Sequence, residues 1–184
     1  MTQGDSIGFG DLSIAISQSG GAGNTIRAML LGGSLDSGNS DTIQYTTIGT
    51  KGKFQDFGDL SSGRQTVAVV STSVQATATA GATSGDTVQN IIEFVNIMTI
   101  GNAIDFGDLT LRKDAGGANG HSSNHVRGLL TGGYSQPASD NINNIDFINI
   151  ATAGNAQDFG DCSVTAGWGY VANTTDSHGG LGGF

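Results

Sequence analysis

The sequence predicts an all-β protein in which a unit of four short strands is repeated along the chain. The first observation is the tripeptide Phe-Gly-Asp, which occurs four times in the 184 residues, beginning at Phe9, Phe57, Phe106 and Phe159. These positions are 48, 49 and 53 residues apart, a period typical of repeat proteins with one small sheet per unit. The second observation is the composition. Glycine supplies 31 residues and proline one, which suits tight turns, and the periodic apolar residues supply the buried faces that disordered chains lack.

The repeat extends beyond the tripeptide. In the last three copies, isoleucines stand fourteen and nine residues before the motif phenylalanine, an aromatic residue twelve before it and a glycine five before it. A pair of small residues follows each motif phenylalanine after 23 residues, or after 26 in the third copy, which has a three-residue insertion in the stretch Gly116 to Asn124. These pairs are Gly32-Gly33, Ala80-Gly81, Gly132-Gly133 and Gly182-Gly183. Each unit is therefore expected to stack on copies of itself.

The first half of each unit is expected to contain two strands. The earlier one is weakly marked, near Thr66 to Ser71 and near Gly169 to Asn173, whereas Gly20 to Gly23 is expected to be a flexible loop. The later strand runs into the small-residue pair. It covers residues 28–31, 75–80 and 126–131.

The second half of each unit should form the other two strands. Ile43 and Tyr45 alternate with Gln44 and Thr46, and the later copies have apolar residues on both faces of this segment, which predicts a strand between two neighbouring sheets. The Phe-Gly-Asp-Leu segment is the last strand. No segment shows a helical period with caps.

The ends of the chain look like complementary halves of one unit. We expect one domain over residues 1–184, with units at 13–60, 61–109 and 110–162 and a fourth made of 163–184 plus 5–12. Ser6 to Ile14 would supply the last strand of this fourth unit, so that no strand edge stays open. Closure of four units within one chain is our prediction. The alternative is that the same halves meet between two chains.

Charge and composition exclude several classes of protein. The net charge is −9, and the seven lysines and arginines are scattered singly, so we expect neither nucleic-acid binding nor membrane attachment. No apolar run reaches membrane length and the first residues lack a signal-peptide pattern, which predicts synthesis in a cytoplasm without membrane insertion. Cys162 stands where the other copies have leucine, so it is expected to be a small core residue.

Chemical motifs are few. The pairs Asp56/Asp59, Asp105/Asp108 and Asp158/Asp161 are expected to bond backbone groups at turns, with calcium binding as the alternative. The three histidines show no zinc spacing. Four arginines, Arg27, Arg64, Arg112 and Arg127, do not recur at one distance from the motif, as a site shared by the units would require. We therefore expect that the protein is not an enzyme and that it has no catalytic residue, bound metal or cofactor.

The residues of the repeat resemble those of the kelch family of β-propellers. The glycine pairs stand where kelch blades carry a double glycine, and Phe replaces the kelch tryptophan at Phe57, Phe106 and Phe159. The aromatic residues at the position of the kelch tyrosine are Tyr45, Phe94 and Phe147. This resemblance implies a small kelch-like β-propeller of about four quasi-blades, whose last blade is completed by the N-terminal strand.

The chain is also similar to kelch-like repeat proteins of tailed phages, especially marine and cyanobacterial ones. The resemblance is carried by the unit Ile145 to Asp161 and by the ending Asp176 to Leu181. It implies a virion protein made in the host cytoplasm and present in multiple copies, placed in the tail, as a tail fibre tip or adaptor, or on the capsid as a decoration. Its partners would be other virion proteins, and in host attachment a surface glycan.

The function we expect is that of a structural or interaction protein that contacts its partners through propeller loops. The loops Ser34–Asp41, Thr83–Thr87 and Ser135–Asn141 should share one face with the turns after the Phe-Gly-Asp strands. A carbohydrate-binding module that recognises host polysaccharide is the alternative. The residues expected to bind the partner are Arg112, His121, Tyr134, Asp36 and Asp140.

Overall fold

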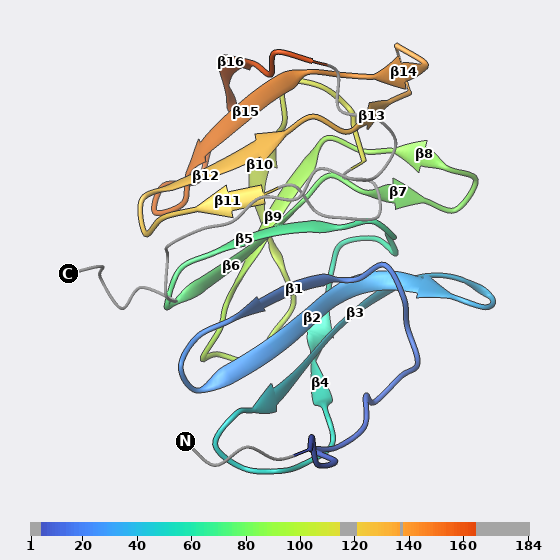
Figure 1. Ribbon diagram of the computed structural model, residues 1–184, viewed down its shortest axis with the longest axis vertical. Coiled ribbons are helices and arrows are strands. Elements are labelled where there is room, and N and C mark those ends of the chain that lie inside the picture. The colour runs from blue at the N-terminus through green and yellow to red at the C-terminus, as the bar shows by residue number, and fades with distance from the viewer. Residues whose placement is uncertain (1–4, 115–120, 137, 165–184) are drawn as a thin grey trace.

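The computed structural model describes residues 5–114, 121–136 and 138–164. Within these residues every regular element is a β-strand, every pairing is antiparallel and no helix occurs, which confirms the predicted all-β class (Figure 1). Among the same residues, no helix has the length and apolarity needed to cross a membrane.

Three four-stranded sheets account for most of the strands, and each sheet corresponds to one repeat. Each sheet is a meander whose strands pair in chain order. Sheet I contains β1 (Gly20–Gly23), β2 (Arg27–Leu35), β3 (Gly38–Thr47) and β4 (Gln55–Asp59). Sheet II contains β5 (Ala68–Ser71), β6 (Gln75–Thr79), β9 (Ile91–Asn96) and β10 (Ile104–Asp108). Sheet III contains β11 (His121–Ser123), β12 (Arg127–Thr131), β15 (Asn144–Asn149) and β16 (Gln157–Asp161).

The hairpin between the second and third strands of each sheet extends past the sheet itself. In sheet I the strands β2 and β3 simply continue to the turn. In the other two sheets the extension is a separate two-stranded hairpin. These hairpins are β7 (Ala82–Thr83) with β8 (Thr87–Val88), and β13 (Tyr134–Ser135) with β14 (Asp140–Asn141).

The three sheets stack in chain order, with sheet II between the other two (Figure 1). Their first strands lie beside one another, and β5 contacts both β1 and β11. The N-terminal segment lies at the sheet I end, and β16 lies at the opposite end (Figure 1). Sheet II is therefore covered on both faces, whereas sheets I and III each have one terminal face.

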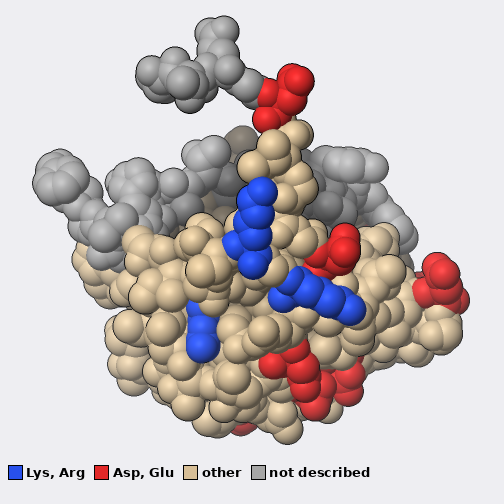
Figure 2. All heavy atoms as spheres, turned by 90° about the horizontal axis from the view of Figure 1, so that it is seen from below, with Lys and Arg blue, Asp and Glu red and all other residues tan. Residues whose placement is uncertain are grey.

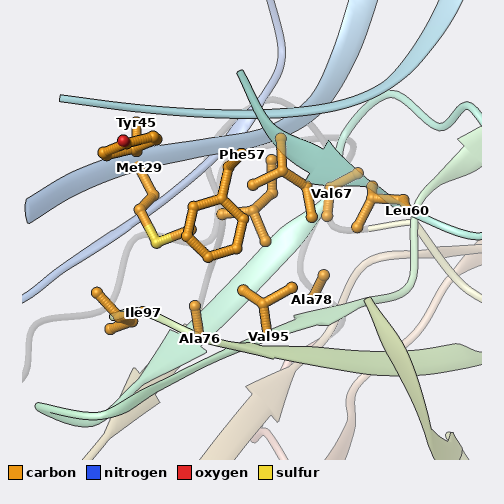
Figure 3. Packing of buried hydrophobic residues seen from close by; sticks show 11 residues of the cluster. Met29, Tyr45, Phe57, Leu60, Val67, Ala76, Ala78, Val95 and Ile97 are labelled. Carbon is orange, nitrogen blue, oxygen red and sulfur yellow. The ribbon is translucent and has the colours of Figure 1, made fainter. Parts of the chain in front are cut away.

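Buried apolar side chains fill the two junctions between the sheets. At the first junction Met29 and Phe57 of sheet I point toward Ala76 and Val95 of sheet II (Figure 3). At the second, Phe106 packs with residues of sheet III that include Leu130 and Ile148. Both faces of β3 are buried, as the sequence predicts for a strand between two neighbours: Ile43, Gln44 and Thr46 are all covered. In β15 only one face is buried, since Ile145 and Phe147 are half-buried.

Two strands that begin the sheets were not predicted. Gly20 to Gly23 was expected to be a loop, but it forms β1, and a Cβ atom on Gly20 would lie 2.3 Å from Cγ2 of Val69. Small residues are required here because β1 approaches sheet II so closely, and a glycine run carries no alternating pattern that would reveal the strand. His121 to Ser123, expected in the loop of the insertion, forms β11. The strand expected near Gly169 to Asn173 lies outside the described residues.

Candidate interaction site

The Phe-Gly-Asp motif forms the last strand of one sheet and also docks that sheet on the next. The carbonyl oxygens of Phe57 and Asp59 accept hydrogen bonds from the backbone N–H groups of Gly101 (2.9 Å) and Ala103 (2.8 Å) in sheet II. At the second junction the carbonyl oxygen of Asp108 accepts one from Ala156 at 2.8 Å. The contact is thus repeated at both junctions.

The glycine of the motif is required by this close approach. Gly58 has a φ of +145°, and a Cβ atom there would lie 2.4 Å from the carbonyl oxygen of Gly101. Gly107 has a φ of +144°, and its Cβ atom would lie 2.6 Å from Gly154. Both the backbone conformation and the space available therefore exclude larger residues.

The phenylalanine of the motif packs within its own sheet. Its ring meets the aromatic residue of the third strand edge to face, with centroid distances of 5.6 Å for Tyr45–Phe57 and 6.0 Å for Phe147–Phe159. The middle pair, Phe94–Phe106, is similar at 5.9 Å. Such geometry is favourable for aromatic rings. It explains why the two aromatic positions recur together.

Each junction buries one polar residue of the third strand of the following sheet. At the first sheet junction Glu93 forms an ion pair with Arg64, and at the second Asp146 pairs with Lys113 at 3.0 Å. Burial lowers the pKa of Arg64 and of Lys113, and the neighbouring carboxylate opposes that shift in each case. Both cations stand seven residues after the motif phenylalanine. These pairs were not predicted from the sequence, because the cation is an arginine in one unit, Arg64, and a lysine in the next, Lys113.

Two arginines also occupy equivalent positions in their sheets. Arg27 lies over the ring of Tyr45 at 4.5 Å, and Arg127 lies over that of Phe147 at 5.2 Å. Each arginine begins the second strand of its sheet. The two arginines are therefore equivalent in the sheets although they do not stand at one distance from the motif, because the insertion in the third copy shifts Arg127. Their role is packing against an aromatic ring.

The N-terminal copy of the motif docks on sheet I in the same way, although it belongs to no sheet. The carbonyl oxygens of Phe9 and Asp11 accept hydrogen bonds from Gly52 (3.1 Å) and Phe54 (2.9 Å). The backbone N–H and hydroxyl of Ser13 donate to Oε1 of Gln44 at 2.9 Å and 2.8 Å. This segment fills what we call the sheet I slot, the backbone of Gly52 to Phe54 together with Gln44. The sequence predicts a strand for this segment. In the structure its hydrogen bonds to the slot do not form the regular pairing of a β-sheet, so it is not a strand.

The opposite end of the stack presents the motif without a following sheet. The side chain of Phe159 is 54% exposed, whereas Phe57 is 1% and Phe106 4% exposed. A Cβ atom on Gly160 would meet no described atom within 4 Å. Asp158 and Asp161 are also exposed. Sheet III therefore ends in an open, partly apolar surface made by β16.

The extended hairpins and the turns after the motif strands share one edge of the stack. Three equivalent backbone bridges join them, at Ser17–Ser34, Gln65–Ala82 and Asp114–Tyr134. The hairpins project on the same side in Figure 1. We call this edge the hairpin face. The structure thus places the three predicted loops on one face.

Four of the five predicted partner-binding residues lie at or near this face. Asp36 is exposed at the turn between β2 and β3, and Asp140 is exposed in β14. Tyr134 is half-buried in β13, and Arg112 is exposed after β10. A further acid, Asp86, is exposed at the β7–β8 turn and was not predicted. Aligning the hairpins would have revealed it.

The fifth residue, His121, is misplaced by the sequence analysis. It lies in β11, and both of its ring nitrogens are buried. Burial, followed by the nearby charge of Lys113, lowers its pKa to about 3. A neutral imidazole whose nitrogens are buried in β11 has no access to a partner at the loops. The prediction that His121 lies in a partner-binding loop is therefore wrong, since the residue lies in β11.

The described residues contain no group of three or more His, Cys, Asp or Glu side chains that could hold a metal ion. Cys162 is half-buried, and its backbone N–H donates to Asn143 at 2.7 Å, as Leu60 and Leu109 donate in their sheets. The sequence matches no protein-family model, and no curated protein is significantly similar to it.

Proposed function

We propose that the protein is a structural and interaction component of a phage particle, which binds other virion proteins through the hairpin face. The observation that carries this proposal is the repetition of an exposed acid at the hairpin tips. Asp36 and Asp86 stand in the turns of their hairpins, Asp140 is the first residue after the turn of the third, and the hairpins project from the same edge (Figure 1). Three similar contacts at regular intervals favour a large partner surface over a small ligand.

The scaffold behind these tips is suited to presenting them. The sheets are held together by buried apolar clusters and buried ion pairs, whereas the hairpins extend beyond the sheets. Loops positioned by a rigid framework are a common location for binding residues. Since the tips are acidic and the net charge is −9, the complementary surface on the partner should be basic.

The architecture that we propose for this role is a kelch-like propeller, with the three sheets as blades. Support comes from the repeat pattern, the four-stranded meanders and the burial of β5 between β1 and β11. Residues 5–12 would be the last strand of a fourth blade, with its other strands supplied by this chain or by a second one. The phage context is supported by the resemblance of the repeated unit to phage kelch-like proteins.

Purified particles provide the direct test. Mass spectrometry should detect the protein in virions, and its density should be found by fitting the fold into a cryo-EM map of the particle. The map would also distinguish tail from capsid placement. Absence of the protein from purified virions would reject the proposal.

Charge reversal at the tips tests the binding face. The triple variant Asp36→Lys, Asp86→Lys, Asp140→Lys should reduce incorporation into particles at least tenfold, because repulsion replaces attraction at three contacts. The control is Asp56→Lys with Asp105→Lys, at exposed acids that are the second residues of β4 and β10. Equal incorporation of both variants would exclude the hairpin face. Binding of the separate protein to host polysaccharide, unaffected by the tip changes, would favour the carbohydrate-binding alternative.

A further inference from the structure

We propose that the chain associates head to tail with copies of itself, with β16 of one copy docking in the sheet I slot of the next. In the separate chain this slot is filled by residues 9–13 of the N-terminal segment, which β16 and Ser163 of the partner copy would replace. The surfaces involved are the two ends of the stack. The inference is therefore independent of the hairpin face and of the function proposed above.

The first argument is that β16 has the same motif as the segments that fill such slots elsewhere in the molecule. The slot donates backbone N–H groups from Gly52 and Phe54, as sheet II does from Gly101 and Ala103. All four motif copies are followed, four residues after the phenylalanine, by Ser or Thr. In three copies this residue contacts the buried polar residue of the next sheet: Ser13 with Gln44, Ser61 with Glu93, and Thr110 with Asp146. Ser163 holds that position after β16 and is exposed.

The second argument is that both ends of the stack expose apolar side chains that are buried at the internal junctions. Phe159 is 54% exposed on sheet III. On sheet I, Ile48 is 47% exposed, although its equivalents Ile97 and Ile150 are 0% and 1% exposed at the junctions. Docking of sheet III on sheet I would cover Phe159 and Ile48 together. It would reproduce the kind of contact that the chain already makes twice.

The third argument is charge. Lys51 and Lys53 are exposed on either side of Gly52 in the slot, where the other sheets have Ile100 and Asn102, or Ala153 and Asn155. Figure 2, seen from the sheet I end, shows basic side chains on this face. The incoming strand β16 has a carboxylate at each end of its motif, Asp158 and Asp161. At these two positions the N-terminal segment has only Asp11, because Gly8 stands in the place of Asp158. The slot therefore suits β16 better than its own occupant.

The N-terminal segment competes with this association. It is a single segment outside any sheet, and Phe9 remains 41% exposed in the slot. Its advantage is that it is tethered, which gives it an effective concentration on the order of millimolar. A second copy brings a whole sheet and a larger contact area. Expelling the segment should therefore strengthen association of the chains.

Gly10→Val in the full-length chain expels the segment selectively. A Cβ atom on Gly10 would lie 2.0 Å from the carbonyl oxygen of Gly52, whereas one on Gly8 would meet no described atom within 4 Å. Sedimentation velocity should show that Gly10→Val associates at concentrations at least tenfold lower than the unaltered chain and the matched control Gly8→Val. A Gly10→Val chain that remains monomeric up to about 1 mM would overturn the proposal. It would favour closure within one chain.

Charge reversal then identifies the surfaces. On the Gly10→Val background, Lys51→Glu with Lys53→Glu should abolish association, and so should Asp158→Lys with Asp161→Lys. All four residues are exposed, so the fold should be retained. In an equimolar mixture of the two variants, the acidic β16 of one faces the basic slot of the other, and the reversed, basic β16 faces the reversed, acidic slot. The mixture should therefore associate again, with the two variants in alternation. Association that persists in either charge variant alone, or a mixture that stays monomeric, would show that β16 and the slot are not the contact.

Discussion

Phe106 and Phe159 occupy the same position in two copies of one motif, yet they lie in different environments. Each packs edge to face on the aromatic residue of its own sheet, at 5.9 Å and 6.0 Å. Phe106 is 4% exposed because sheet III covers it, and Phe159 is 54% exposed at the end of the stack. The motif thus has two roles, one within its own sheet and one at the junction with the next. Its local structure forms within one sheet, whereas its burial depends on the sheet that follows.

The largest expected effect comes from substituting the two phenylalanines. Phe106→Ala should lower the free energy of unfolding by about 3–5 kcal/mol, because it leaves a cavity between sheets II and III. Phe159→Ala should cost about 1 kcal/mol or less, since most of that ring is already in water. Urea denaturation of both variants measures the difference. Equal losses in the monomer would mean that Phe159 is covered within its own chain.

The ion pair between sheets I and II should give the next largest effect. Arg64→Met should cost about 3 kcal/mol, because Glu93 is left buried without its partner. The double variant Arg64→Met, Glu93→Leu should recover most of that loss, since two apolar groups replace the pair. At the sheet I slot the corresponding contact, between Ser13 and Gln44, is uncharged. Gln44→Leu should therefore lower the free energy of unfolding by only about 1 kcal/mol. A thermodynamic cycle from urea denaturation tests the coupling. A double variant as unstable as Arg64→Met would contradict it.

The smallest effect at neutral pH concerns two histidines, His121 in sheet III and the exposed His125 before β12. The pKa of His121 is lowered to about 3 by burial, so between pH 6.5 and 3 the unfolded chain binds a proton that the folded chain does not. Stability should therefore fall as the pH drops through this window, by up to about 1.4 kcal/mol per pH unit from this residue. His121→Leu should remove that part of the slope, measured by denaturation at several pH values. His125→Leu, at an exposed position, should leave the slope unchanged.

Much of the fold could be predicted from local patterns. The strands β3, β9 and β15 were predicted because apolar residues alternate along them, and β4, β10 and β16 because the motif recurs. Strand β1 was missed because its glycines reflect a close approach to Val69, which belongs to another repeat. The hairpin tips Asp36 and Asp140 could be placed from the loop positions, but His121 could not, since its burial depends on the sheets packed around β11.

The sequence by itself determined the repeat, the meander within each sheet and the pairing of the motif phenylalanine with an aromatic neighbour. These features depend on side-chain alternation and turn residues within about fifty positions. Only the tertiary structure decided which motif copies are buried, that Arg64 and Lys113 pair with acids of the following sheet, and that residues 9–13 fill the slot on sheet I. The physical reason is that these contacts join different repeats. The same Phe-Gly-Asp segment is covered or open according to what lies beside it.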